Sequence, residues 1–113
     1  MSTDRSHRSL IAVLGLGRFG QRLALQLARG GEDVIACDRN RDAVELIATD
    51  VAQAVALDVT DEQAMRAQGI QRAKAGVIGI GEDFGSSVLC TTLLRQMEIP
   101  RVIARARSRT TAE

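Results

Sequence analysis

A glycine-rich loop follows the first apolar run of the chain and opens its first helical stretch. The apolar run covers residues 10–14, the loop covers Gly15–Gly20, and helical periodicity continues to about Arg29. The glycines of the loop have the spacing G-x-G-x-x-G, which arises by chance in many loops. Between a predicted strand and a predicted helix, however, this spacing is typical of a dinucleotide-binding loop. The sequence therefore predicts a strand, a phosphate-binding turn and a helix in that order.

Each glycine of the loop has its own expected role. Gly15 permits the tight turn out of the strand, Gly17 lets a phosphate approach bare backbone, and Gly20 lets the helix pack close to the sheet. The unpaired N–H groups and positive dipole at the start of the helix then face the phosphates. Arg18 either reaches phosphate oxygens or lies along the helix surface, and its place inside the loop favours the phosphate. The candidate ligand contacts in the loop are Gly15, Leu16, Gly17, Arg18, Phe19 and Gly20.

An aspartate at the end of the second apolar run supplies a second signal. Asp38 follows Gly20 by 18 residues, which is close to the spacing at which a carboxylate accepts hydrogen bonds from the ribose hydroxyls of a dinucleotide. The next residue, Arg39, could stack on adenine or could prefer a 2′-phosphate. Because Asp38 would repel that phosphate, NADP is not the expected ligand.

The size and composition of the chain are those of one ordinary globular domain. It has 113 residues, of which 45% are hydrophobic and 26% charged, and its net charge is +1. Such a chain can bury a real core, and no apolar segment approaches the roughly 20 residues that a membrane-spanning helix needs. We expect a disordered polar leader over residues 1–9, one domain over residues 10–108 and a tail over residues 109–113.

Strands and helices are predicted to alternate along the chain. The predicted strands are residues 10–14, 33–37, 52–57, 76–80 and 101–106, and the predicted helices are residues 18–29, 41–49, 61–68 and 84–97. Near-continuous apolar runs in the first, second and fourth strands suit parallel strands that are covered on both faces. The alternation predicts an α/β fold, a Rossmann-like doubly wound parallel sheet with strand order 3-2-1-4-5. The ligand crevice is then expected where this order reverses, beside the glycine loop.

Local signals support the predicted helix ends. Gly30 and Gly31 stop the first helix, and Pro100 bars continuation of the fourth. Thr60, with Gln63 three residues later, forms a capping-box pattern at the start of the third helix.

Apolar side chains cover a wide face of the fourth predicted helix. This face suits a helix buried at the centre of the domain, and it also suits a helix that packs partly against another subunit. Cys90 on this face and Cys37 in the second strand have no metal-ligand spacing around them. We therefore expect two buried thiols in a reducing compartment rather than a disulfide or redox pair. The residues of the apolar face are Val88, Leu89, Cys90, Leu93, Leu94 and Met97.

Two further segments follow the glycine loop and Asp38 in order. They are residues 57–62, Leu-Asp-Val-Thr-Asp-Glu, and residues 103–107, Ile-Ala-Arg-Ala-Arg. Together with the loop and Asp38, they resemble the nucleotide-binding domain of Trk/Ktr/Kef-type potassium transport regulators, also called the RCK or TrkA-N domain. The resemblance covers residues 10–108. It implies a domain that binds ATP, ADP, AMP or NAD(H), forms a homo-oligomer and gates a potassium channel or transporter from the cytoplasmic side of the membrane.

The resemblance also implies ligand contacts outside the glycine loop. The family's ribose carboxylate falls on Asp38, followed by Arg39. Its adenine-side segment falls on residues 57–60, its loop near the phosphates on residues 81–83, and its basic residue at the end of the fifth strand on Arg105. Asp58 could bond an adenine amino group or act as a loop carboxylate near a helix cap. The additional candidate contacts are Asp58, Val59, Gly81, Glu82 and Arg105.

The chain departs from the family pattern at several positions. Leu57 and Val59 replace the usual glycine and alanine, which implies a more crowded adenine side. Glu82 places a negative charge near the phosphates and would oppose a free triphosphate unless a cation or Arg18 offsets it. The usual sixth strand, last helix and second regulatory domain are not among these 113 residues.

Neither catalysis nor nucleic-acid binding has much support in the residues. The only histidine, His7, lies in the leader, so no Ser-His-Asp or Cys-His arrangement can be built. The G-x-x-x-x-G-K-[ST] loop of phosphoryl-transfer proteins is absent. Because Phe19 and Phe84 are the only aromatic residues, the arginines near the C-terminus have few stacking partners for bases. We therefore expect a binding module and not an enzyme, with the cofactor-binding half of an NAD-dependent dehydrogenase as the alternative.

Overall fold

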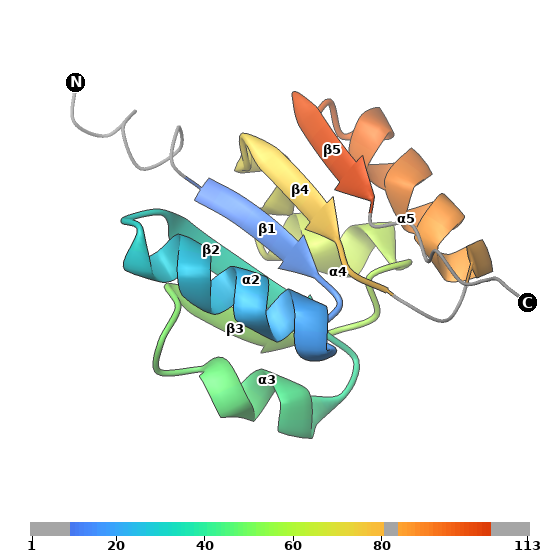
Figure 1. Ribbon diagram of the computed structural model, residues 1–113. Helices are drawn as coiled ribbons and strands as arrows, with labels where there is room; N and C mark the ends of the chain where they lie inside the picture. The colour runs from blue at the N-terminus through green and yellow to red at the C-terminus, as the bar shows by residue number, and fades with distance from the viewer. Residues whose placement is uncertain (1–9, 81–83, 105–113) are drawn as a thin grey trace, which may run out of the picture.

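The computed structural model describes residues 10–80 and 84–104 (Figure 1). The strands are β1 (Leu10–Leu14), β2 (Asp33–Asp38), β3 (Gln53–Ala56), β4 (Ala75–Ile78) and β5 (Arg101–Ala104). The helices are α2 (Arg18–Arg29), α3 (Arg41–Ile47), α4 (Glu62–Ala67), the short 3₁₀ helix η1 (Ile70–Arg72) and α5 (Phe84–Gln96). The predicted alternation of strands and helices is confirmed, and α2 has the predicted bounds. The sequence pattern does not predict η1.

The five strands form one parallel sheet in the order β3-β2-β1-β4-β5, which confirms the predicted order. Strand β1 lies at the centre, where Leu14 is in register with Cys37 of β2 and Ile78 of β4. The chain runs outward from β1 through β2 to β3, then crosses back to β4 on the other side of β1. The order therefore reverses between β1 and β4, and the helices that follow these two strands, α2 and α5, pack on opposite faces of the sheet.

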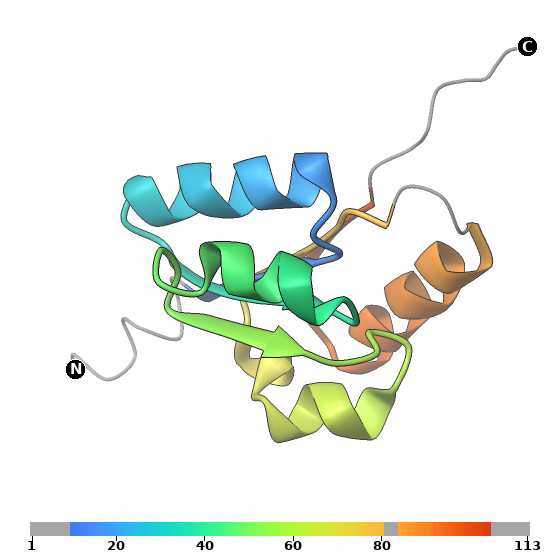
Figure 2. The same cartoon turned by 90° about the horizontal axis from the view of Figure 1, so that it is seen from below.

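Helices cover both faces of the sheet, as the view in Figure 2 shows. Helices α2 and α3 pack on one face, and α4 and α5 lie on the other. Each face has its own apolar cluster. Ile11 and Val13 belong to the cluster under α2, whereas Ala12 and Leu14 belong to the cluster under α5. This division follows from the alternation of side chains along a strand, and it explains why β1 is apolar at every position.

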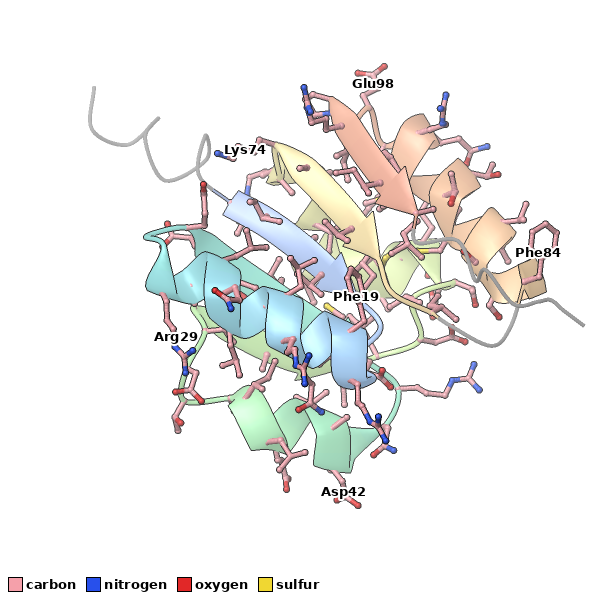
Figure 3. All side chains as sticks on the ribbon, viewed as in Figure 1. Phe19, Arg29, Asp42, Lys74, Phe84 and Glu98 are labelled. Carbon is pink, nitrogen blue, oxygen red and sulfur yellow. The ribbon has the colours of Figure 1, made fainter. Side chains whose placement is uncertain are left out.

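Helices α2 and α5 end in the same hydrogen-bond pattern. After each helix, two successive backbone N–H groups donate to carbonyls of the last turn at 2.9–3.2 Å. This is the Schellman arrangement, in which the residue after the cap adopts a left-handed conformation. In α2 that residue is Gly31, with φ 97°, so the predicted glycine stop is confirmed. In α5 it is Glu98, with φ 62°, whose side chain points away from the sheet (Figure 3).

The start of α4 differs from the capping box that the sequence predicts. The N-cap is Asp61, whose carboxylate accepts a hydrogen bond from the N–H of Ala64 at 3.2 Å. The hydroxyl of Thr60 instead donates to the carboxylate of Asp58 at 2.6 Å. The prediction that Thr60 caps this helix is therefore wrong. The charged carboxylate of Asp58, two residues earlier, binds the hydroxyl of Thr60, and Asp61, one residue later, caps the helix.

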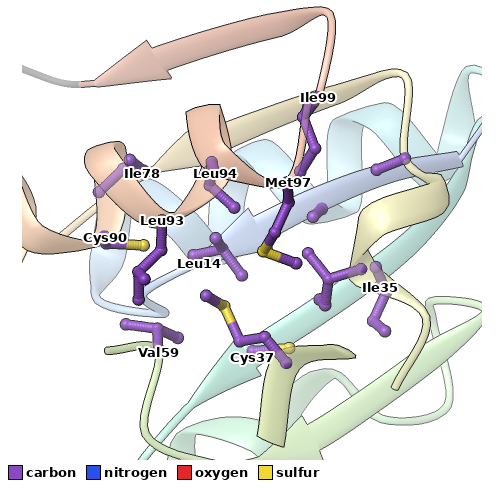
Figure 4. Packing of buried hydrophobic residues seen from close by; sticks show 14 residues of the cluster. Leu14, Ile35, Cys37, Val59, Ile78, Cys90, Leu93, Leu94, Met97 and Ile99 are labelled. Carbon is purple, nitrogen blue, oxygen red and sulfur yellow. The ribbon is translucent and has the colours of Figure 1, made fainter. Parts of the chain in front are cut away.

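The cluster under α4 and α5 contains both cysteines (Figure 4). Cys37 of β2 and Cys90 of α5 are fully buried, and neither forms a disulfide. Burial raises the pKa of each thiol to about 12, because a thiolate would lose its solvation there. The predicted buried thiols are confirmed.

Candidate nucleotide-binding site

The loops that follow β1, β2 and β3 meet at one edge of the sheet. The N–H of Gly15 donates to the carbonyl of Cys37 at 2.8 Å, which ties the first loop to the end of β2. The N–H of Leu57 donates to the carbonyl of Asp38 at 3.1 Å, which ties the loop after β3 to the same place. Parallel strands carry their carboxyl ends at one edge, so residues far apart in the sequence gather there.

Two glycines of the first loop allow backbone segments to touch. Gly15 has φ 103°, and a Cβ there would lie 2.9 Å from the carbonyl carbon of Gly79 and from the nitrogen of Ile80. A Cβ on Gly20 would collide with the carbonyl oxygen of Gly15. The end of β4, the loop after β1 and the first turn of α2 therefore cross in direct contact. The tight turn at Gly15 and the close helix packing at Gly20 agree with the sequence analysis.

Gly17 differs from the other two glycines of the loop. It is exposed, its φ is −73° and its ψ is −164°. Apart from Gly17 itself and its two chain neighbours, no atom of the described residues comes within 4 Å of the place of a Cβ. Any residue can adopt such a backbone conformation, so neither conformation nor packing within the described residues requires glycine here. The space beside Gly17 is open at the position where the sequence analysis expects a phosphate.

The start of α2 also differs from the starts of α3 and α4. Helix α3 is capped by Asn40 and helix α4 by Asp61, and each has an acidic residue in its first turn. The N-cap of helix α2 is Gly17, which provides no side-chain cap, and the first turn of the helix has no acidic residue. A helix N-terminus of this kind attracts an anion through its N–H groups and dipole. Arg18, the first residue of the helix, is exposed and adds positive charge.

The carboxylate of Asp38 lies at the end of β2, beside this loop. One oxygen accepts a hydrogen bond from the N–H of Leu16 at 2.6 Å, and the other accepts one from the N–H of Asn40 at 2.8 Å. A carboxylate has about four acceptor sites, so capacity remains for ribose hydroxyls. The side chain is half-buried, which leaves part of it accessible to a ligand.

Arg39 and Asp58 link the loops after β2 and β3. Their side chains form an ion pair at 3.5 Å, and both are exposed, so the pair contributes little to stability. Asp58 also accepts hydrogen bonds from the N–H and the hydroxyl of Thr60 at 2.9 and 2.6 Å. These bonds, with a smaller effect of Arg39, lower the pKa of Asp58 below its ordinary value. Asp58 is therefore a loop carboxylate near the start of α4, and its bond to an adenine amino group remains a prediction.

Three apolar candidates are held mainly by the core. The side chains of Leu16 and Val59 are buried in the clusters on opposite faces of the sheet. Only their backbones can line the site. Phe19 is half-buried, packs against the cluster under α2 and lies 3.5 Å from the place of a Cβ on Gly79 (Figure 3).

Two residues that sequence reasoning missed help to build the site. Gly79 permits the crossing with Gly15, and Asn40 caps α3 while its N–H donates to Asp38. A glycine between two isoleucines at the end of a strand is a signal for close backbone approach, so Gly79 could have been found. Gly81, Glu82 and Arg105 lie outside the described residues, and their roles remain predictions.

Two other features are absent from the part of the chain that the structure describes. No group of three or more histidine, cysteine or acidic side chains gathers there to hold a metal ion. Among residues 10–80 and 84–104, no helix has the length and apolar composition needed to cross a membrane.

Comparison with known proteins identifies the family. Residues 11–113 match the model of the TrkA-N domain. The chain belongs to the TrkA-N domain family. This confirms the resemblance seen in the glycine loop, Asp38 and the two later segments.

The relatives of this TrkA-N domain include potassium uptake proteins. Ktr system potassium uptake proteins A and C of Bacillus subtilis (strain 168) are 34% and 32% identical to it over 97 residues. The match covers 86% of this chain and 44% of each relative, so the chain spans less than half of their length. Among solved structures, the NAD(P)-binding domain of an exopolyphosphatase-related protein from Archaeoglobus fulgidus superposes with a TM-score of 0.76. It is 27% identical, and the match covers 90% of this chain and 76% of that one.

Proposed function

We propose that this TrkA-N domain binds an adenine nucleotide and thereby regulates a potassium channel or transporter. The observation that carries the proposal is the uncapped start of α2 at Gly17, open to solvent and next to the carboxylate of Asp38. Phosphates lie over Gly15–Gly20, where N–H groups and the helix dipole favour an anion. The ribose hydroxyls donate to Asp38, in the manner of dinucleotide-binding folds.

Other candidate residues complete the proposed site. Arg39 and Asp58 flank the adenine side, with the backbone of Val59 beside them. Gly81, Glu82 and Arg105 act near the phosphates, as the family resemblance implies. The ligand is ATP, ADP, AMP or NAD(H), and the NAD(P)-binding description of the archaeal structure supports this class.

The domain acts as a regulator and not as an enzyme in this proposal. Its relatives are named as potassium uptake proteins, which favours regulation over the cofactor-binding half of a dehydrogenase. Incubation with NADH and common oxo-acids, or with ATP, should give no product above blank. Sustained turnover by pure protein that is lost in Gly17→Val would contradict this part of the proposal.

The proposed partners are further copies of the chain and a membrane subunit that conducts potassium. The domain would be cytoplasmic and peripheral, held at the inner face of the membrane through that subunit. Apolar side chains remain exposed on α5 and β5, where a partner could cover them. They are Phe84 (83% exposed), Val88 (47%), Leu89 (47%) and Ile103 (50%).

Calorimetric titration with ATP, ADP, AMP, NAD⁺ and NADH tests the central claim. At least one should bind, and Asp38→Ala should weaken it by about ten- to a hundredfold, the loss of hydrogen bonds to a charged group worth roughly 1.5–3 kcal/mol. Glu45→Ala, which removes a carboxylate from the exposed face of α3, is the control and should bind like the parent. If the folded parent binds none of the five nucleotides, the proposed function is wrong.

A further inference from the structure

We propose that Asp38 is a positioning residue for the glycine loop as well as a ribose acceptor. Through its bond to Leu16, this carboxylate would hold the loop in the shape that accepts phosphate. Ribose recognition and phosphate affinity would then be coupled at one side chain. The part of the inference that concerns phosphate rests on the proposed function, whereas the part that concerns the loop does not.

A hydrogen bond connects the backbone N–H of Leu16 to the carboxylate of Asp38. It joins residues 22 positions apart, from the end of β2 to the loop after β1, at 2.6 Å. A charged acceptor and so short a distance mark a strong hydrogen bond. Leu16 stands between two glycines, the residue type with the greatest backbone freedom. Its side chain is buried under α2, so Leu16 is held by the core on one side and by Asp38 on the other.

Comparison with Asp58 shows that this bond is not part of a common local turn. Asp38 is the last residue of β2 and Asp58 lies two residues after β3. Each accepts the N–H of the residue two positions later, Asn40 at 2.8 Å or Thr60 at 2.9 Å. The second oxygen of Asp58 faces the exposed side chain of Arg39 at 3.5 Å. The second oxygen of Asp38 instead binds the backbone of the phosphate loop. One oxygen of Asp38 therefore takes part in a local turn with Asn40, and the other holds the glycine loop through Leu16.

Replacing Asp38 by asparagine separates positioning from charge, because the two effects have opposite signs. Removing a negative charge beside the phosphates should by itself tighten the binding of an anion. An asparagine side chain, however, has one oxygen and cannot accept from the N–H groups of both Leu16 and Asn40 in the way a carboxylate does. Loss of the hydrogen bond to Leu16 should therefore loosen the glycine loop and weaken the binding of phosphate.

Amide hydrogen exchange of the ligand-free protein, followed by NMR, tests positioning alone. Exchange at Leu16 should be at least about tenfold faster in Asp38→Asn than in the parent, the loss expected for a hydrogen bond to a charged group. Asp61→Asn, which changes the same charge at the cap of α4, should leave Leu16 unchanged. Exchange at Val13 and Val77 in the sheet reports that the variants are folded. Should Asp38→Asn fail to fold, Asp38→Glu keeps the charge and displaces the carboxylate. Unchanged exchange at Leu16 in the folded variant overturns the inference.

Titration with inorganic tripolyphosphate tests the coupling to phosphate. This ion has phosphates but no ribose or base, so Asp38 cannot affect it through a ribose contact. Its binding should weaken several-fold in Asp38→Asn and stay the same in Asp61→Asn. Tighter or unchanged binding in Asp38→Asn, or no binding to the parent, overturns the coupling. If the parent binds no nucleotide, the proposed function fails, while hydrogen exchange at Leu16 still decides the positioning role.

Discussion

At the scale of single residues, the three glycines of the loop differ in whether the fold requires a glycine at their position. Backbone contacts inside the domain require glycine at positions 15 and 20. A Cβ on Gly15 would overlap the backbone of Gly79 and Ile80 after β4, and a Cβ on Gly20 would overlap the carbonyl oxygen of Gly15. Gly17 has no such cause within the described residues. A side chain at Gly17 would instead fill the space where a phosphate would lie. The contrast between these positions gives the sharpest test of the proposed site.

Gly17→Val should abolish nucleotide binding and leave the fold intact. The added side chain meets open space and an ordinary backbone conformation, so the melting temperature and helix content should stay close to those of the parent. Calorimetric titration with the nucleotide that binds best measures the loss. Gly20→Ala serves as the contrast, because its Cβ meets the carbonyl oxygen of Gly15 and should destabilise the fold by about 1–3 kcal/mol. Parent-like binding by folded Gly17→Val would contradict the phosphate assignment.

The sequence predicts the positions of site residues better than their contacts. Glycine spacing and the distance to Asp38 place a phosphate loop beside a carboxylate, because both follow from the strand–loop–helix order. The bond from Leu16 to Asp38 could not be predicted, since it depends on which way one backbone N–H points after the loop has folded. The burial of Val59 could not be predicted either, because an apolar residue in a loop can face the core or a ligand.

At the scale of elements, the ends of α2 and α5 show one geometry achieved with different residues. Gly31 takes the left-handed position after α2 without steric cost, whereas Glu98 takes it after α5 with a Cβ in place. The strain at Glu98 is maintained by the turn that returns the chain to β5. The next residue, Ile99, is buried in the same cluster as Leu94 of the last turn, which is the apolar contact that often accompanies this cap.

Glu98→Gly should stabilise the domain by about 0.5–1 kcal/mol, because glycine removes the steric cost of the left-handed conformation. Urea unfolding followed by circular dichroism measures the change. At the matching position of α2, Gly31→Ala should destabilise the domain by a similar amount. A lower free energy of unfolding in Glu98→Gly would show that its side chain makes a contribution larger than the strain.

Long periodic elements were predictable, and short ones were not. Strand β1 and helix α2 have the predicted bounds because strong apolar patterns mark both. The helix η1 has three residues, too few for any periodicity to appear. The cap of α4 was misassigned because Thr60 and Asp61 are both good cap residues. Only the folded loop shows that Thr60 is already bound to Asp58.

At the scale of the whole molecule, α5 buries one part of its wide apolar face and leaves another part exposed. Cys90, Leu93 and Leu94 are buried against the sheet, whereas Val88 and Leu89 are about half exposed. Phe84 projects from the first turn of the same helix (Figure 3). The sequence could not separate the two sets, because apolar residues look alike whether they face the core or a partner.

Light scattering should show more than one chain per particle. Nucleotide should change the distribution of particle sizes, because a ligand shifts assembly when it binds the assembled states with different affinities. Phe84→Glu combined with Val88→Glu should shift particles toward monomers, since both side chains lie on one exposed side of α5. Leu46→Glu, at an exposed apolar position of α3, is the control and should leave the distribution unchanged. A strict monomer at high concentration, with and without nucleotide, would count against self-assembly.

Both cysteines should resist thiol reagents at pH 8 until the domain unfolds. The pKa of each buried thiol is about 12, so almost no thiolate is present in the folded state. Because folding raises this pKa above its ordinary value near 9, stability should be fully present below about pH 9 and should fall as the pH rises toward 12. Labelling followed by mass spectrometry, with and without urea, measures the protection. Rapid labelling of the folded domain would contradict the burial of Cys37 and Cys90.

The central position of β1 determines at which stage of folding the nucleotide site can form. Ile11 is in register with Val34 and with Ala75, which follows it by 64 residues. Pairing over such a separation forms slowly, and Gly15 touches Gly79 only after it has formed. A chain emerging from the ribosome therefore cannot form the contact between Gly15 and Gly79 until β4 has been synthesised and has joined the sheet. Nucleotide would stabilise the finished domain alone and draw late folding intermediates toward it.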